Sequence, residues 1–382
     1  MTSPRKHAPV LLAALALCAA ASGQPDPAPS APPASPAPSP TPAPVAAEKD
    51  TRPDGTASAQ NSAVANEITP ELDDAVAKGL AYLVSEQGPD GSFGSGRYGK
   101  NIAVTALACI ALMADGNVPG RGEYGKNVEK GLEFVLKSST ETGLLAADST
   151  NGPMYGHGFA TLFLGEAYGM TKGGGETPLS TRVHEALVKA CTLIERSQNT
   201  EGGWRYNPVP YDADVSVTIC QIMALRSARN AGIEVPKETI DKAVEYVRQC
   251  QNGDGGFRYQ LSPGVSAPPR SAAGVASLYY AGIYKDDALT RGLAYLTSNA
   301  LPGASLAPGA HYYYGQYYAV QAMYLAGGDQ WARWWPAIRR ELLDRQQRDG
   351  SWGDPSVGPA YGSAMALIIL QMPKRFLPIF QK

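Results

Sequence analysis

The sequence predicts an all-α domain in which six helix pairs close into a ring, with an inner barrel of helices inside an outer ring. The first observation behind this prediction is a phrase that is repeated along the chain: Gln, two residues, an acid, Gly, a small residue, then Phe or Trp. Its four copies are Gln87–Phe93, Gln198–Trp204, Gln251–Phe257 and Gln346–Trp352. The second observation is that each copy follows an amphipathic stretch and precedes an apolar one. A phrase repeated in this way indicates one helix–turn–helix unit copied along the chain.

The stretches before the phrase are expected to form the outer helices. In the first of them, Leu72, Val76, Leu80 and Leu83 recur at helical spacing, and Ile240, Ala243, Val244 and Val247 do so before the third copy. Such a pattern predicts a helix that is apolar on one face only. The stretches after the phrase, 104–112 and 217–225, are apolar on nearly all sides. A helix of this kind is buried all round, so these segments are expected to form the inner barrel.

The composition of the phrase suits a turn between the two helices. Gly supplies the backbone freedom to leave the outer helix, and the acid before it can accept hydrogen bonds from nearby backbone amides. The Phe or Trp is expected to pack back between the two layers as an anchor. The Gln is expected to bond the main chain of an adjoining unit.

Two units are expected to have lost the phrase, because the spacing between the first and second copies, and between the third and fourth, is about twice the remaining one. In the first gap, 128–136 leads through Thr142–Leu145 to an inner helix at 159–168. In the second gap, 288–296 leads through a Gly- and Pro-containing loop to 312–325. The total is therefore six pairs, a number that can close on itself.

The N-terminal residues predict export. Arg5, Lys6 and His7 precede a short Leu/Ala run, so residues 1–23 are interpreted as a secretory signal peptide. Residues 24–66 are rich in Pro, Ala and Ser and are expected to form a disordered linker, which leaves 67–382 for the ring domain. The predicted location is periplasmic or extracellular. Leu15–Cys18 resembles a lipoprotein box, and membrane attachment is expected only if Cys18 is lipidated.

Charge and cysteine content exclude some classes of partner. The formal net charge is −2 and no basic stripe is present, so no nucleic-acid partner is expected. Cys109, Cys191, Cys220 and Cys250 all fall within predicted helices, where buried thiols are the main interpretation. A disulfide bond is the alternative interpretation, because export permits one and four cysteines allow three pairings. No cysteine or histidine spacing resembles a zinc cluster, and no metal or cofactor is predicted.

The repeated phrase resembles the QW repeat of squalene cyclases, and the six-pair layout resembles the α/α toroid of terpenoid cyclases and protein prenyltransferase β subunits. The resemblance covers residues 67–382. Squalene cyclases carry an Asp-x-Asp-Asp run in which a protonated carboxyl group protonates an alkene. Asp212 and Asp214 match two positions of this run, while Val215 stands at the third. The resemblance implies Asp214 as the proton donor and Asp212 as its partner; the alternative is that Asp214 only caps the helix that begins at Val215.

Aromatic residues are the second set of candidates, because their faces stabilise carbocations and suit a flexible isoprenoid. The alternative is that these tyrosines only fill the centre of a small ring. The candidate ligand-binding residues are Tyr211, Tyr279, Tyr280, Tyr313, Tyr314, Tyr317 and His311.

Three functions remain open at this level. The first is an exported cyclase-like toroid that binds an isoprenoid or another apolar ligand. The second is an active, proton-initiated cyclase of the isomerase or lyase type that uses Asp212 and Asp214. The third is a non-enzymatic module with a structural role or a protein partner. A zinc prenyltransferase is not expected: His157 and His311 lie at predicted inner-helix rims, but the rim near Arg270 offers neither an acid nor a Cys.

Overall fold

The computed structural model describes residues 67–147, 152–171, 177–303 and 311–381. The predicted signal peptide, the linker and Cys18 lie outside these residues. The first described helix begins where the sequence predicts it. Thr69 is its N-cap and accepts a hydrogen bond from the Leu72 backbone N–H at 3.3 Å, and Pro70 occupies the first helical position.

The described residues form twelve α-helices and no β-strand, in agreement with the all-α prediction. The outer helices are α2 (Pro70–Ser85), α4 (Gly125–Lys137), α6 (Pro178–Ser197), α8 (Lys237–Gln249), α10 (Asp287–Asn299) and α12 (Gly328–Arg345). The inner helices are α3 (Ile102–Met113), α5 (Met154–Thr171), α7 (Val215–Asn230), α9 (Pro268–Tyr280), α11 (Tyr312–Ala326) and α13 (Pro359–Leu370). Short 3₁₀ turns are η1 (Gly96–Tyr98), η3 (Met372–Lys374) and η4 (Pro378–Phe380).

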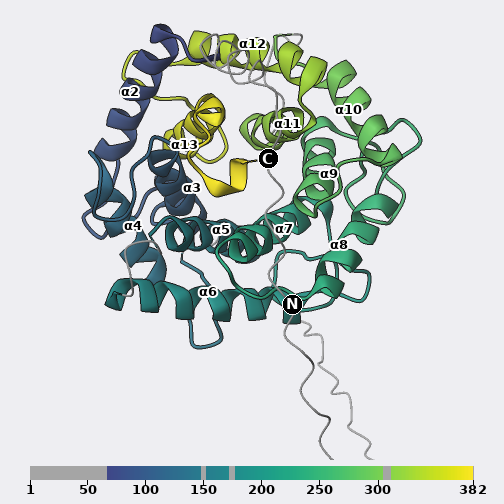
Figure 1. The fold of residues 1–382 in the computed structure, drawn as a ribbon, viewed down its shortest axis with the longest axis horizontal. Coiled ribbons are helices and arrows are strands. Elements are labelled where there is room, and N and C mark those ends of the chain that lie inside the picture. Colours follow the sequence, from purple (N-terminus) through teal and green to yellow (C-terminus); the bar gives the residue numbers. More distant parts are fainter. Residues whose placement is uncertain (1–66, 148–151, 172–176, 304–310, 382) are drawn as a thin grey trace, which may run out of the picture. The chain divides into compact units, whose positions relative to one another are not determined.

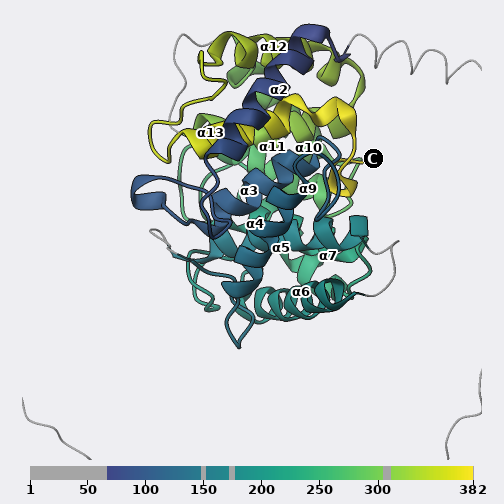
Figure 2. The same cartoon turned by 90° about the vertical axis from the view of Figure 1, so that its left-hand side faces the viewer.

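The six helix pairs close into a ring, as Figure 1 shows. Each inner helix packs against the next one along the chain, and α13 packs against α3, which completes the inner barrel. The outer helices surround it, and α12 meets α2 where the ring closes. The side view in Figure 2 shows that the inner and outer helices lie within the same layer. No helix in the described part of the chain is long and apolar enough to cross a membrane.

The repeated Gln joins neighbouring units, as the sequence predicts. Each Gln side-chain amide donates one hydrogen bond to the Gly carbonyl of its own turn and another to a carbonyl in the first turns of the next outer helix. The second acceptors are Asn127 O for Gln87, Thr239 O for Gln198, Ala288 O for Gln251 and Ala75 O for Gln346, at 2.8–2.9 Å. The bond from Gln346 returns to α2, so the last copy ties the end of the ring to its beginning.

The aromatic residue of the phrase anchors the turn to the inner helix. Its backbone N–H donates to a hydroxyl group in the first turn of that helix, for example from Trp204 to Thr218 Oγ1 at 3.1 Å and from Trp352 to Ser363 Oγ at 2.9 Å. In the first of the two units without the phrase, formed by α4 and α5, the Leu145 N–H donates to His157 Nδ1 at 3.1 Å. His157 therefore stands where other units use Thr or Ser, and its role is structural. Its Nε2 lies 3.2 Å from the Ala190 carbonyl, and burial lowers the pKa of His157 to about 4, so the ring is neutral.

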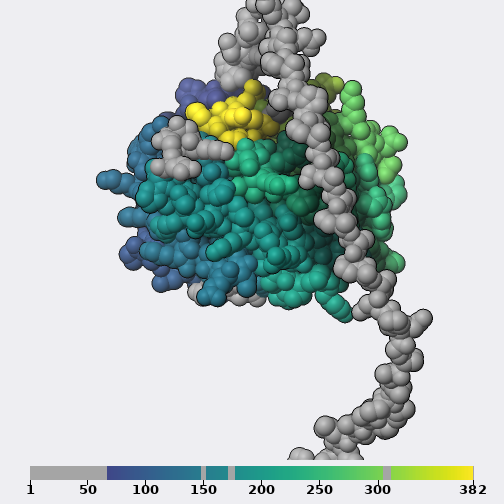
Figure 3. Space-filling model, turned by 60° about the horizontal axis from the view of Figure 1, so that its bottom comes forward, coloured from purple at the N-terminus to yellow at the C-terminus, as the bar shows by residue number. Residues whose placement is uncertain are grey.

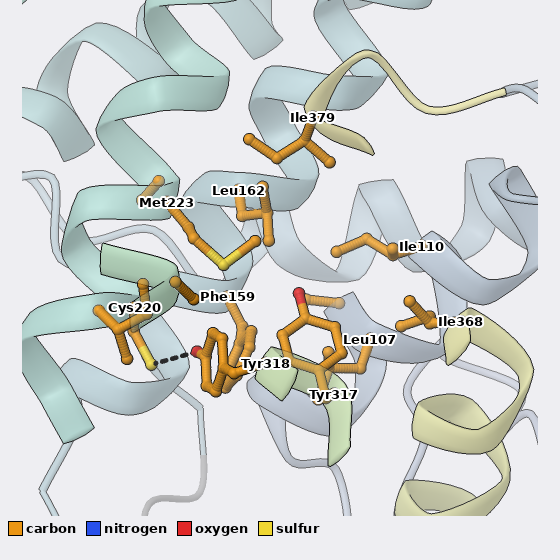
Figure 4. Close-up of a cluster of buried hydrophobic side chains, with 14 of the residues drawn as sticks. Leu107, Ile110, Phe159, Leu162, Cys220, Met223, Tyr317, Tyr318, Ile368 and Ile379 are labelled. Atoms are coloured by element: carbon orange, nitrogen blue, oxygen red, sulfur yellow. Dashed lines mark hydrogen bonds between the residues drawn. The ribbon is translucent and has the colours of Figure 1, made fainter. Parts of the chain in front are cut away.

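The C-terminal segment closes the end of the barrel formed by the C-terminal halves of the inner helices. η4 packs against α5 and α7, and Ile379 reaches the core beside Leu162 and Ile110 (Figure 4). Glu166 on α5 holds this segment: its carboxylate accepts from Ser227 Oγ at 2.6 Å and from the Ile379 backbone N–H at 3.1 Å. The end of the chain (yellow) is visible at the surface of the ring in Figure 3.

Glu166 predicts a dependence of stability on pH. Burial raises its pKa to about 7, whereas a carboxyl group in the unfolded chain titrates near 4.5. The folded state therefore keeps a proton that the unfolded state releases, so this contribution to stability is complete below pH 4.5 and is lost as the pH rises through 7. We expect the free energy of unfolding of Glu166→Gln, relative to that of the wild type, to be higher at pH 8 than at pH 5. Urea denaturation of both proteins at the two pH values measures this difference. Glu71→Gln, at an exposed position, controls for the change in net charge; an equal pH effect in both variants would contradict the assignment.

Candidate functional site

A cavity of about 1160 Å³ lies at the N-terminal ends of the inner helices. All six inner helices contribute a residue from their first turns, which places the cavity in the mouth of the barrel. This volume is sufficient for a sizeable organic ligand. The aromatic residues that line it are Tyr98, Tyr155, Phe159, Tyr206, Tyr259, Tyr314 and Tyr361. Among the described lining residues there are two arginines, Arg97 and Arg270, and neither Asp nor Glu.

Asp214 lies beside this cavity but is fully enclosed, with an exposed fraction of 0%. It is the N-cap of α7, where Oδ1 accepts from the Val217 backbone N–H at 2.8 Å. Oδ2 accepts from the Tyr259 hydroxyl at 3.1 Å and lies 3.5 Å from Arg205 Nε. The alternative of a helix cap is therefore confirmed as a contact, although capping uses only one of the two oxygens.

Burial raises the pKa of Asp214 to about 6. The hydrogen bonds from Val217 and Tyr259 and the charge of Arg205 act in the opposite direction, because each of them stabilises the carboxylate. Removal from water outweighs them. A carboxyl group in this condition carries its proton at mildly acidic pH, which is the property that a general acid requires.

Asp212 lies two residues before Asp214 and has a different environment. Its side chain is 39% exposed and forms an ion pair with Arg205, with Nη1 and Oδ2 2.5 Å apart. Arg205 thus lies between the two carboxyl groups. In a cluster of acids, repulsion between the carboxylates would keep one proton bound. In this chain Arg205 bridges the two carboxyl groups instead, and the apolar Val215 stands where a third acid would be.

Two tyrosine hydroxyl groups connect Asp214 with the cavity. The hydroxyl of Tyr259, which bonds Asp214, lies 2.5 Å from the hydroxyl of Tyr206, and both residues line the cavity. The Arg205 guanidinium lies over the Tyr206 ring at 5.0 Å and over the Tyr259 ring at 5.8 Å. The Tyr155 ring lies beside that of Tyr206, with 6.1 Å between centroids.

The structure places some of the predicted ligand-binding residues in the cavity lining and others outside it. Tyr314 and His311 line the cavity, and the Tyr314 hydroxyl donates to Ser216 O at 2.9 Å. The expectation that Tyr211 faces the cavity is corrected: it lies in the loop before α7 and is 86% exposed. Whether Tyr314 or His311 binds a ligand stays a prediction.

The prediction that Tyr279 and Tyr280 line the cavity is also corrected. Both residues lie at the C-terminal end of α9, whereas the cavity lies at its N-terminal end. Tyr279 packs against Tyr284 at a separate surface depression, and Tyr280 is buried and donates to Gln321 Oε1. On α11, Tyr313 is buried against Tyr312, outside the cavity lining. Tyr317 lies one helical turn after Tyr314, with 0% exposure, in the packed centre beside Phe159 (Figure 4). Here the alternative of tyrosine as core filling is the correct one.

Sequence reasoning missed Tyr155, Tyr206 and Tyr259 as residues of the site. A signal for two of them was present, since Arg205-Tyr206 and Arg258-Tyr259 both follow the repeated phrase directly. Their backbones fix the loops, and their side chains line the cavity.

The remaining cysteine and metal candidates are structural or unsupported. Cys109, Cys191, Cys220 and Cys250 are buried free thiols, so no disulfide joins them. Within the described residues, no group of three His, Cys, Asp or Glu side chains is placed to hold a metal ion.

Comparisons with solved structures identify the fold. The type II terpene cyclase MstE from Scytonema, in its apo form, matches with a TM-score of 0.55 at 14% identity, covering 81% of this chain and 100% of that one. An α-1,6-mannanase from Salegentibacter matches with a TM-score of 0.60 at 8% identity, covering 80% and 99%. The chain has the α/α-toroid fold that these two proteins share. The mannanase match shows that this fold also supports unrelated chemistry, so the toroid alone does not determine a reaction.

One sequence comparison points in the same direction as the fold. Drimenyl diphosphate synthase from Streptomyces showdoensis is 27% identical to this toroid over 186 residues, which is 48% of the chain and 32% of that relative. The matched part of the chain thus spans about a third of the length of this curated relative. No family model matches the sequence.

Proposed function

We propose that this toroid binds a flexible isoprenoid in the tyrosine-lined cavity and starts its cyclisation by protonation, with Asp214 as the source of the proton. The observation that carries the proposal is the burial of Asp214, which raises its pKa to about 6 directly beside an aromatic cavity. The similarity to drimenyl diphosphate synthase and the terpene cyclase fold support the same reaction class.

The cavity lining suits a carbocation. Six tyrosines and Phe159 offer aromatic faces, which attract a positive charge without forming a bond to it. The described lining has no carboxylate that would trap the cation. The same feature disfavours a glycoside hydrolase of the mannanase type, since that reaction generally needs two carboxyl groups flanking the scissile bond.

Proton donation by Asp214 predicts a specific loss of turnover in Asp214→Asn. The amide cannot supply a proton but keeps an oxygen for the Val217 N–H, so the free energy of unfolding should change by no more than about 1 kcal/mol. Turnover should fall about 100-fold or more. The assay uses squalene, farnesyl diphosphate and geranylgeranyl diphosphate in D₂O, because protonation from solvent-exchanged Asp214 introduces one non-exchangeable deuterium into each cyclic product. Wild-type turnover should also fall as the pH rises through 6, where Asp214 loses its proton.

Asp286→Asn is the matched control. Asp286 caps α10 through Ala288 N–H and pairs with Arg248, so it repeats the structural role of Asp214 away from the cavity. It should leave turnover unchanged. If wild-type protein converts none of the three probes, or if Asp214→Asn converts them as well as the wild type does, the proposed function is wrong.

A further inference from the structure

We propose that Asp214 communicates with the cavity through the hydroxyl groups of Tyr259 and Tyr206, and that these tyrosines, not the carboxyl group, meet the ligand. This inference rests on the proposed function for its chemistry. It goes beyond that function by assigning the proton path to two side chains from neighbouring repeats.

Asp214 is enclosed by the residues around it. None of its surface is exposed, so a molecule in the cavity cannot contact the carboxyl group without movement of the residues around it. Oδ1 is held by the Val217 N–H, and Oδ2 is covered by the Tyr259 hydroxyl. A direct transfer from Asp214 to a carbon atom in the cavity is therefore blocked.

The groups that cover Asp214 form a chain of hydrogen bonds that ends in the cavity. Asp214 Oδ2 and the Tyr259 hydroxyl oxygen are 3.1 Å apart, and the hydroxyl oxygens of Tyr259 and Tyr206 are 2.5 Å apart. Both tyrosines line the cavity. The three groups form one continuous chain from the buried acid to the ligand space.

Backbone hydrogen bonds hold the loops of both tyrosines in place. Tyr206 and Tyr259 occupy the same position, two residues after the aromatic anchor, in consecutive copies of the phrase. The Tyr259 carbonyl accepts from the Val215 N–H at 3.0 Å, which fixes its loop against the start of α7. The Tyr206 carbonyl accepts from the Met154 N–H at 3.1 Å, which fixes the other loop against α5. The two hydroxyl groups are therefore positioned by the scaffold itself.

The proton balance closes without another reactant. The alkene π pair forms a C–H bond with the Tyr206 proton, which leaves a carbocation on the substrate. When Asp214 is protonated, its Oδ2–H donates to the Tyr259 hydroxyl and Tyr259 donates to Tyr206, which reverses the bond that Tyr259 donates to the carboxylate. In the transfer, Tyr206 takes the Tyr259 proton, and Tyr259 takes the proton of Asp214. Both tyrosines end as neutral phenols, and Asp214 becomes a carboxylate that Arg205 and the Val217 N–H stabilise.

Few charged groups face this chain. Arg205 is the cation in contact with Asp214, and Asp212 is its partner. The other titratable neighbours are the thiols of Cys220 and Cys250 and the phenols of Tyr155, Tyr246 and Tyr314, and burial raises the pKa of each. Among the groups of this hydrogen-bonded chain, Asp214 is consequently the one expected to titrate between pH 5 and 7. His311 also lines the cavity, outside this chain.

The chain of hydroxyl groups can be tested on the full protein without a ligand. Protein labelled with ¹³C at tyrosine Cζ is titrated by NMR from pH 5 to 7.5, with Tyr206→Phe and Tyr259→Phe used to assign the signals. We expect the signals of Tyr259 and Tyr206 to shift together with a midpoint near pH 6 and to become flat in Asp214→Asn. In Tyr259→Phe, which keeps the ring and removes only the hydroxyl, the Tyr206 shift should collapse to the small through-space effect seen at Tyr314, whose hydroxyl bonds Ser216 O instead.

Two results would overturn the proposal: no shift of Tyr206 in the wild type, or a Tyr206 shift that survives intact in Tyr259→Phe. The turnover assay gives a second readout with the same three probes. Tyr259→Phe should lower kcat about 100-fold and leave KM nearly unchanged, because the ring surface that contacts the ligand remains. An unchanged kcat would reject the relay while the proposed function stands. If the wild type converts no probe, the proposed function fails and the NMR titration still decides whether the chain exists.

Discussion

Trp352→Ala is expected to lower the free energy of unfolding by about 3–5 kcal/mol, the usual range for a large aromatic residue removed from a core. Trp352 is fully buried, and its indole Nε1 donates to Leu342 O at 2.7 Å. Its ring lies against α2, where a Cβ atom on Gly79 would come within 2.6 Å of it. The substitution therefore opens a cavity at the place where the last unit of the ring meets the first. Chemical denaturation followed by circular dichroism measures the loss.

Trp352→Phe is the control for this prediction. Phe93 and Phe257 occupy the same position in two other units, so the turn accepts a benzyl ring. The variant loses the indole hydrogen bond and some volume, and we expect a cost of about 1–2 kcal/mol. Equal costs for the Ala and Phe variants would show that ring packing at this position contributes little to closure.

Gly255→Ala is expected to destabilise the protein by about 2–6 kcal/mol. Gly255 has φ = +85°, a conformation that is strained for residues with a side chain, at about 1–3 kcal/mol. A Cβ atom here would also lie 2.6 Å from the Arg291 carbonyl oxygen on α10, and forcing atoms into a packed site costs a further ~1–3 kcal/mol. The glycine is required because the turn passes directly over the backbone of the next outer helix.

The same turn contains its own control. Gly253 lies two residues earlier, is not in the left-handed region, and a Cβ atom there would meet nothing within 4 Å. Gly253→Ala should change the free energy of unfolding by no more than about 0.5 kcal/mol, or stabilise slightly by restricting the unfolded chain. Urea denaturation of the two variants side by side tests the argument. A similar loss in both would mean that the contact with α10 is not what selects glycine.

The repeat predicted more than the number of helices. The role of Gln346 followed from the other copies, and its bond to Ala75 O closes the ring as the repetition requires. His157 shows the limit of the same reasoning. The sequence placed it at a predicted inner-helix rim without assigning it a function, whereas the Leu145 N–H uses it as a replacement for the Thr or Ser hydroxyl of other units. Nothing in the local sequence indicates this structural role.

The candidate site was predicted in part. Asp214 was selected from its run of acids, and both its cap and its burial agree with the position at the start of α7. The tyrosines were selected by how densely they crowd the inner helices, and this criterion placed Tyr280 and Tyr317 in a cavity that they do not reach. Density along a helix carries no information on depth, and a cavity at one end of a barrel is lined only by the first turns and the loops before them.

By itself, the sequence determined six helix pairs, the order of inner and outer helices and the chemistry of the turns. These features are local, because helix periodicity, capping and glycine geometry are set within a few residues and are then repeated. Only the tertiary structure decided which tyrosines face the cavity and that Asp214 is closed off from it. Tyr259, which covers Asp214, comes from the following unit and is separated from it by 45 residues. A contact of that kind depends on how two units pack, which no single unit encodes.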